Sequence, residues 1–176
     1  MRLSLAATLV AGAALLAGCT GSGPPDGFAE GKASNVTVAH PKDWSVTSTG
    51  TTYQAELRAG AKTTAVLTAE RIDVQSGDAR GALVTELTGP QMSWFGYTVR
   101  GMQDLEIEGA ESAARVNYTY RDPREKGIAT GPATGTDIAV VVPGRKVDLV
   151  RLTWSNGALT ADQVNQIVST VRYRES

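Results

Sequence analysis

The stretch Ser112–Tyr120, Ser-Ala-Ala-Arg-Val-Asn-Tyr-Thr-Tyr, decides the fold, because from its third residue onward apolar and polar side chains alternate. One face carries Ala114, Val116, Tyr118 and Tyr120, and the other carries Arg115, Asn117, Thr119 and Arg121. Successive side chains of a strand point to opposite sides of a sheet. The alternation therefore predicts an antiparallel strand with one covered face and one wet face.

The segments around this strand also predict strands. Downstream, residues 136–142 and 146–154 are apolar on both faces and are separated by the turn sequence Pro-Gly-Arg. Such segments are typical of central strands that are covered on two sides. Upstream, alternating runs predict further strands at 36–40, 44–46, 53–57, 64–74 and 99–107.

Two segments have helical periodicity instead. The first begins after Asp78, a typical N-cap, and Gly89 followed by Pro90 predicts its end. The second begins after Thr160, with Gln163 placed to complete a capping box. The second helix has an apolar stripe of Val164, Ile167, Val168 and Val171. Strands in sequence with two inserted helices predict an α+β domain built on an antiparallel sheet.

The N-terminal sequence predicts where the protein is located in the cell. An uncharged stretch at 3–18 follows Met1-Arg2 and is too short to span a bilayer, but it suits a signal peptide. It ends in Leu16-Ala17-Gly18-Cys19, which matches the lipobox of bacterial lipoproteins, with the only cysteine at the position that is lipidated. We therefore expect a signal peptide at 1–18, a lipidated Cys19 with a flexible Gly/Pro tether at 19–34, and one domain at 35–176. The chain would then lie on the extracytoplasmic face of the cell membrane, anchored by lipid.

Composition excludes several functions. The net charge of −1 gives no basic footprint for nucleic acid. With Cys19 lipidated and His40 the only histidine, the chain has too few ligands for a zinc site and no nucleophile elbow beside a base. We expect no catalytic residues, no metal, no cofactor and a monomeric chain whose membrane contact is its lipid.

An aromatic connector is the first candidate binding site. Met92, Trp94, Phe95 and Tyr97 fall within six positions between the first helix and the next strand. Such side chains can line an apolar pocket or lie on acyl chains. They can equally fill the gap between the helix and the sheet, as large aromatic side chains usually do.

The second candidate is the long segment 121–135. Its first half is charged, with Arg121, Arg124 and Lys126, and its second half is rich in Gly, Pro and Thr. Long loops on a rigid sheet often bind partners. The alternative is a disordered surface excursion with no partner.

The order of these features resembles a known family. The lipobox and Gly/Pro segment, the stretch His40-Pro41-Lys42-Asp43-Trp44, the helix that ends at Gly-Pro and the terminal helix are similar to the actinobacterial LpqN-type lipoproteins. The resemblance implies a PsbP-like (also DcrB-like) α/β/α sandwich and a non-enzymatic envelope protein. We therefore expect a binding or accessory module for an envelope protein or lipid. A carrier of an envelope lipid or glycolipid is the alternative, and a hydrolase comes third.

Overall fold

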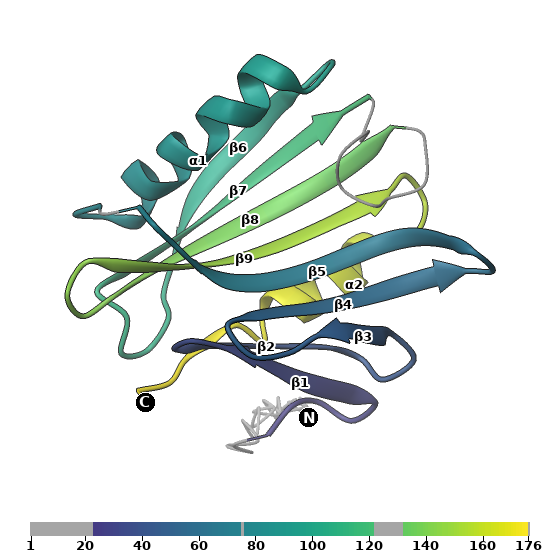
Figure 1. Ribbon diagram of the computed structural model, residues 1–176, viewed down its shortest axis with the longest axis horizontal. Coiled ribbons are helices and arrows are strands. Elements are labelled where there is room, and N and C mark those ends of the chain that lie inside the picture. The colour runs from purple at the N-terminus through teal and green to yellow at the C-terminus, as the bar shows by residue number, and fades with distance from the viewer. Residues whose placement is uncertain (1–22, 75, 122–131, 176) are drawn as a thin grey trace, which may run out of the picture.

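The computed structural model describes residues 23–74, 76–121 and 132–175. Two sheets and two helices make up this part of the chain (Figure 1). The strands are β1 (Phe28–Ala33), β2 (Val36–Pro41), β3 (Ser45–Ser48), β4 (Thr52–Ala59), β5 (Lys62–Ile72), β6 (Thr98–Leu105), β7 (Ser112–Tyr120), β8 (Ala133–Val142), β9 (Lys146–Ser155) and β10 (Arg172–Tyr173). The helices are α1 (Ala79–Ser93) and α2 (Ala161–Val168).

The larger sheet has seven strands in the order β3-β4-β5-β9-β8-β7-β6, and every neighbouring pair is antiparallel. The alternation in β7 is confirmed: Ala114, Val116, Tyr118 and Tyr120 are buried, and Arg115, Asn117 and Thr119 are only partly covered. The central strands β8 and β9 are buried on both faces for most of their length, as predicted.

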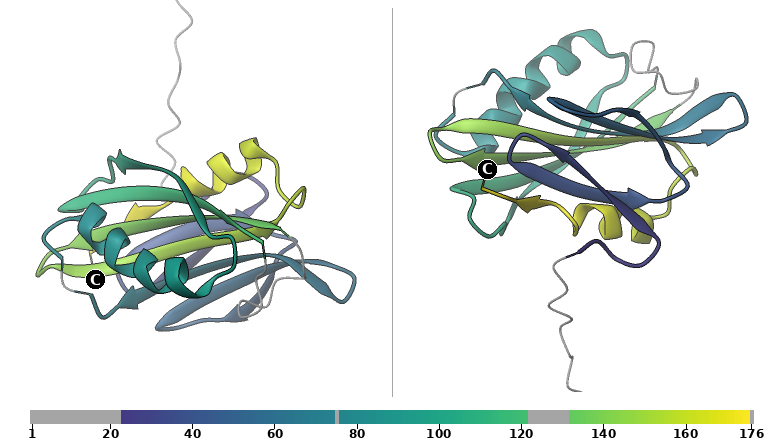
Figure 2. Two further views of the ribbon diagram at one scale, coloured as in Figure 1. Left: turned by 90° about the horizontal axis from the view of Figure 1, so that it is seen from above. Right: turned by 60° about the horizontal axis from the view of Figure 1, so that its bottom comes forward.

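The two faces of the larger sheet are covered differently (Figure 2). Helix α1 covers one face, where Leu83 and Leu87 pack with Val116 and Leu149. Helix α2 and the smaller sheet, β1-β2-β10, cover the other face. The sheet therefore has one hydrophobic core on each side, and the predicted α+β class is confirmed.

Helix α2 begins as its sequence predicts. The Thr160 hydroxyl accepts a hydrogen bond from the Gln163 amide at 3.2 Å, and the Gln163 side chain accepts one from the Thr160 amide at 2.9 Å. This reciprocal pair satisfies two backbone donors that the helix leaves free at its first turn. Val164 and Ile167 are buried below it, whereas Gln166 is exposed.

Helix α1 runs further than predicted, through Pro90 to Ser93. Proline has a helical φ, but it lacks the N–H and its ring crowds the carbonyl four residues earlier, so Pro90 weakens the helix at this point without ending it. The Trp94 amide donates to the Pro90 carbonyl at 2.8 Å, and the Ser93 hydroxyl donates to the Gly89 carbonyl at 2.8 Å. These bonds hold the turn that Gly89-Pro90 was expected to break.

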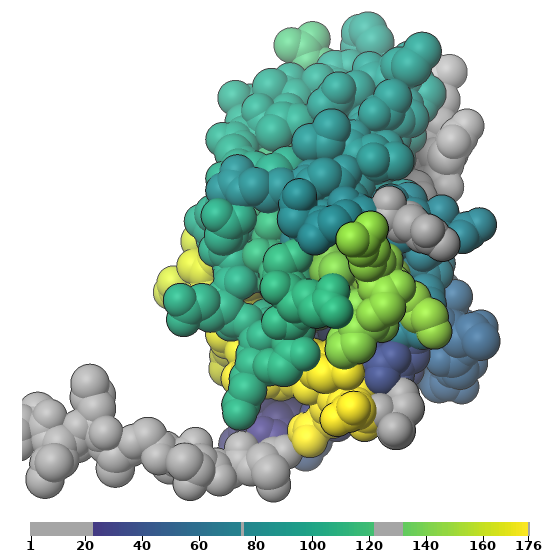
Figure 3. Space-filling model, turned by 90° about the vertical axis from the view of Figure 1, so that its left-hand side faces the viewer, coloured from purple at the N-terminus to yellow at the C-terminus, as the bar shows by residue number. Residues whose placement is uncertain are grey.

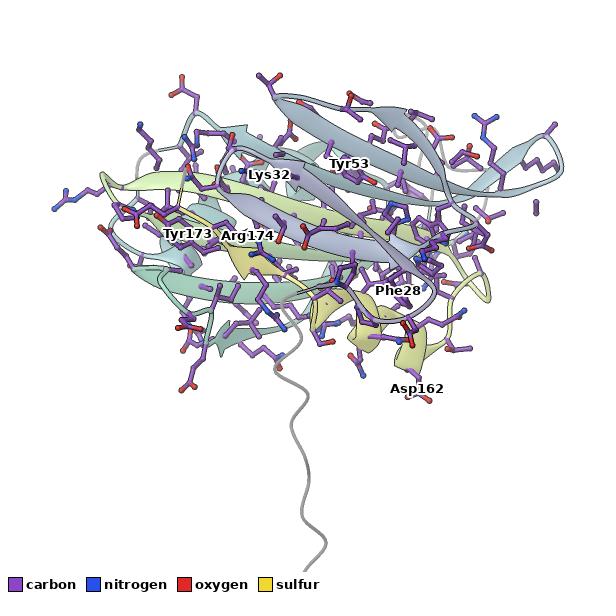
Figure 4. All side chains as sticks on the ribbon, turned by 90° about the horizontal axis from the view of Figure 1, so that it is seen from below. Phe28, Lys32, Tyr53, Asp162, Tyr173 and Arg174 are labelled. Carbon is purple, nitrogen blue, oxygen red and sulfur yellow. The ribbon has the colours of Figure 1, made fainter. Side chains whose placement is uncertain are left out.

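The predicted tether at 19–34 is also corrected, because residues 28–33 form β1. This strand pairs with β2 along its whole length, and Phe28 and Ala33 are buried. Figure 4 labels Phe28 and Lys32 on β1, with Tyr53 of β4 beyond them. A Cβ at Gly31 would lie 2.1 Å from the Tyr53 ring, so the glycine that suggested a flexible segment instead allows close packing. The folded unit therefore begins before residue 35.

Candidate functional site

The aromatic connector separates into two pairs of side chains. Trp94 and Tyr97 are partly buried and pack against the core beneath α1. Met92 and Phe95 are 85% and 70% exposed. Neither sequence alternative therefore holds for all four residues, because two extend the core and two lie in solvent.

Trp94 and Tyr97 belong to a cluster of four aromatic rings at one end of the α1 face. The Trp94 ring lies 5.0 Å from that of Tyr120 and 5.6 Å from that of Tyr97. The Tyr97 and Tyr118 rings stack at 5.0 Å. Gly135, opposite Tyr118 on β8, leaves the space for this ring, because a Cβ there would come within 2.3 Å of it. The rings fill the space between the end of α1 and the sheet.

A buried ion pair lies beneath these rings. Arg151 of β9 donates from Nε and Nη2 to the Asp137 carboxylate at 2.8–3.0 Å, and Tyr118 donates to the same carboxylate at 2.8 Å. Asp137 is 1% exposed. Burial alone would lower the pKa of Arg151, but the Asp137 carboxylate raises it above its usual value. Burial also raises the pKa of Tyr118, and that of Tyr120 to about 12.

This cluster can do little chemistry with a substrate. Its phenols stay protonated at neutral pH because their pKa values are raised, so none serves as a base. The buried hydroxyls of Tyr97 and Tyr120 have no hydrogen-bond partner within the described residues. The cluster is a closed part of the core that fixes the end of α1 on the sheet.

His40 is also enclosed. It is 1% exposed and lies between the rings of Trp44 and Tyr53, with centroid distances of 5.8 and 5.9 Å. One ring nitrogen lies 2.5 Å from the Tyr53 hydroxyl and the other 2.7 Å from the Pro41 carbonyl. Burial lowers the pKa of His40, so the imidazole is neutral at pH 7. Its nitrogens are thus engaged inside the core.

The loop predicted at 121–135 is only partly described. Arg121 is exposed, and its backbone amide donates to the Phe95 carbonyl at 3.0 Å, which joins the end of β7 to the aromatic connector. Arg124 and Lys126 lie outside the described residues. Within residues 23–74, 76–121 and 132–175, no group of three His, Cys, Asp or Glu side chains is placed to hold a metal ion.

The structure also brings together a polar surface that the sequence did not identify. It lies on the face of β6 and β7 opposite α1, next to α2. We call it the Arg115 surface. Its members are Arg100, Gln103, Arg115, Asn117, Thr119 and Asn165. The sequence predicted only that one face of β7 is wet, because the neighbours of Arg115 come from strand register and from α2.

No family model matches the chain, and no curated protein matches its sequence. Its fold is similar to that of the Ran-binding protein Mog1p of Saccharomyces cerevisiae, with a TM-score of 0.56 and 8% identity over 83% of this chain and 95% of that one. Its fold is also similar to that of PA94, a protein of unknown function from Pseudomonas aeruginosa. The TM-score is 0.55, and the sequences are 15% identical over 85% of this chain and 99% of that one. These two likenesses confirm the predicted fold.

LpqN of Mycobacterium tuberculosis, described as involved in cell envelope biogenesis, gives a TM-score of 0.49 and 14% identity over 80% of this chain and 83% of that one. At such identities a likeness shows the fold alone. With a TM-score below 0.5, this likeness adds nothing to the fold already shown by the two other structures, and the resemblance to the LpqN-type family belongs to the proposal below.

Proposed function

We propose that this chain is a lipoprotein of the bacterial cell envelope, held on the outer face of the cell membrane by lipid on Cys19, whose domain is a non-catalytic binding module. The observation that carries the proposal is the sequence Leu16-Ala17-Gly18-Cys19 directly after an uncharged stretch. Within the described residues, no helix has the length and apolar character needed to cross a bilayer. In this proposal the acyl chains on Cys19 supply the attachment to the membrane.

The position of β1 supports a short connection to the membrane. Eight residues lie between Cys19 and Phe28, and the nine residue steps that join the two span at most about 30 Å when extended. The end of the domain that carries β1 and β10 would thus lie near the bilayer, with α1 at the opposite end (Figures 1 and 3). A cleft of about 750 Å³ at the membrane end is lined by Gly23, Glu30, Tyr173 and Arg174, among others.

The enclosed histidine supports a binding role over catalysis. A Ser-His or Cys-His mechanism needs an imidazole within reach of both a nucleophile and a substrate. The nitrogens of His40 instead face the Tyr53 hydroxyl and a backbone carbonyl in the core. The lipid-carrier alternative is also weaker, because Trp94 and Tyr97 fill the space beneath α1 where an acyl chain could lie.

The anchor is tested by replacing Cys19 with alanine and following processing by mass spectrometry and membrane fractionation. We expect the variant to remain an uncleaved precursor without lipid, while Ser22→Ala, three residues beyond Cys19, is processed normally. Mature-length, membrane-bound Cys19→Ala protein would contradict the anchor.

The non-catalytic role is tested on protein purified from its own membranes. We expect no hydrolysis of nitrophenyl esters, phosphates or glycosides above that of a His40→Gln control. Native mass spectrometry of the same sample distinguishes the binding-module proposal from the lipid-carrier alternative. A stoichiometric lipid beyond the covalent anchor would favour the carrier.

A further inference from the structure

Arg115 carries a half-buried positive charge that the described residues leave without a carboxylate. Other partly buried arginines have one: Arg71 is paired with Asp148 at 2.8 Å, and Arg151 with Asp137 at 2.8 Å. Burial lowers the pKa of Arg115, and no neighbouring charge offsets it. Burying an unpaired guanidinium, even partly, costs free energy unless an anion pairs with it.

Neutral acceptors fix the orientation of this guanidinium. Its Nε lies 2.8 Å from the Thr136 hydroxyl and 3.0 Å from the Asn117 side-chain oxygen, and its Nη1 lies 3.4 Å from that of Asn165. A guanidinium has five N–H donors. The two donors on Nη2 have no acceptor within the described residues, so they remain for a ligand.

A second arginine lies on the same surface. The register of β6 against β7 shifts between Val99 and Gly101, and the Arg100 Nε lies 3.2 Å from the Thr119 hydroxyl. Thr119 and Asn117 are successive residues on one face of β7, so they are about 7 Å apart. The Arg100 and Arg115 guanidiniums are each held at one of these residues, so both positive charges lie on the same face of β7.

The remaining neighbours are neutral and polar. Gln103 is exposed directly opposite Arg115, and Thr119 lies opposite Thr134. Next to Thr134, on β9, is the partly buried ring of Trp154. Amides and hydroxyls pair with sugar hydroxyls, and an indole offers an apolar plane for the ring of a sugar.

We propose that the Arg115 surface binds an anionic saccharide, a sugar that carries a carboxylate or a phosphate. The oxyanion accepts hydrogen bonds from Nη2 of Arg115, Arg100 supplies the second positive charge, and Gln103 and Asn117 bond to the sugar hydroxyls. Arg–carboxylate and Arg–phosphate contacts of this kind are short and directional. The proposal rests on the proposed role as a binding module and names the class of ligand.

The test uses the full lipidated chain in nonionic detergent, labelled with nitrogen-15. Glucuronate, glucose 6-phosphate, glucose and inorganic phosphate are titrated separately and followed by two-dimensional NMR. We expect the two charged sugars to shift the signals of Arg115, Arg100 and Asn117, with glucose and phosphate binding at least about tenfold more weakly. Equal affinity for glucose would overturn the anionic site, and equal affinity for inorganic phosphate would overturn the saccharide.

Arg115→Gln is the decisive variant, with Arg58→Gln on β4 as a matched control. Arg58 is exposed and paired with Glu56 at 2.9 Å. We expect Arg115→Gln to weaken glucuronate binding by at least about tenfold and to keep or raise the melting temperature, because no partner charge is left unpaired. The control should bind as the wild type does.

A purely structural arginine would behave in the opposite way, with a lower melting temperature and unchanged binding, and that result would overturn the proposal. Arg100→Gln, at an exposed position, gives a second measurement if Arg115→Gln does not fold. These outcomes are independent of the Cys19 test, so the anchor and the ligand site can fail separately.

Discussion

Each face of the larger sheet buries a tyrosine ring against a glycine, but the polar side chains that bond to the two tyrosines differ. On the α2 side, Tyr53 of β4 packs on Gly31 of the smaller sheet. On the α1 side, Tyr118 of β7 lies over Gly135 of the neighbouring strand β8. The first glycine lets two sheets approach each other, and the second lets a ring lie across its own sheet.

The polar partners of the two tyrosines differ in charge. Tyr53 bonds to His40, which burial keeps neutral, whereas Tyr118 bonds to the Asp137 carboxylate that is paired with Arg151. A neutral imidazole between rings avoids the cost of burying a charge. The ionised pair compensates that cost with several short hydrogen bonds. The Tyr118 site should therefore be the more sensitive to loss of one partner, and the Tyr53 site the more sensitive to pH.

Asp137→Ala should have the largest effect. It leaves Arg151 buried without its main partner and removes the acceptor of Tyr118, which typically costs about 3–5 kcal/mol of unfolding free energy. Glu86→Gln is the control, because Glu86 lies 3.8 Å from Arg151 and is more exposed, so its loss should cost under about 1 kcal/mol. Urea unfolding measures both. Similar losses would mean that the charge is shared between the two carboxylates.

Ile167→Asp on the α2 side should cost more than about 3 kcal/mol, because it places an unpaired charge at a fully buried position. Gln166→Asp, one step around the helix, is exposed and should cost far less. Thermal unfolding compares the two variants. Equal destabilisation would show that α2 packs with another face toward the sheet.

The glycines allow a direct comparison of the two faces. Gly31→Ala and Gly135→Ala should each cost about 1–3 kcal/mol, because the new methyl group would lie within 2.3 Å of a tyrosine ring. Gly89→Ala in α1 meets nothing within 4 Å and should be neutral or stabilising by up to about 1 kcal/mol. Replacing Tyr118 with Leu should relieve most of the loss in Gly135→Ala. No relief would mean that the cost comes from the backbone.

The smallest effect should be the pH dependence from His40. Its folded pKa lies below the unfolded value of 6.5, so its contribution is complete above that pH and is lost as the pH falls through the folded pKa. The slope should not exceed about 1.4 kcal/mol per pH unit. Chemical unfolding at several pH values between 5 and 7.5 should give a shallower slope in His40→Gln. An unchanged slope would assign the dependence to other groups.

Local signals predicted the parts of the fold that local physics determines. The alternation in β7 and the capping box of α2 depend on neighbours in sequence, and both are confirmed. Strand β1 was missed because Glu30, Gly31 and Lys32 suggest a solvated linker, whereas its pairing with β2 and its packing on Tyr53 are tertiary. Helix α1 continues past Pro90 because Trp94 and Ser93 donate hydrogen bonds to the carbonyls of its last turn.

The candidate site shows the same division. Composition identified Met92, Trp94, Phe95 and Tyr97 as a group, but only the path of the chain after α1 decides which of them reach Tyr118 and Tyr120. Arg115 was predicted to lie on the solvent-facing side of β7, and the structure places it on that side, partly covered. That its guanidinium meets only neutral acceptors depends on β8 and α2, and no local pattern encodes it.

The smaller sheet joins the two ends of the chain, and this has a consequence for how the protein is made. Strand β2 pairs with β10, Val36 lying opposite Tyr173, and the Ala39 amide donates to the Thr170 hydroxyl at 2.8 Å. A ribosome delivers the chain from its N-terminus, so β2 emerges more than a hundred residues before its partner β10. Contacts that close so long a loop form late. The smaller sheet is therefore completed late in synthesis, once β10 has emerged and can pair with β2.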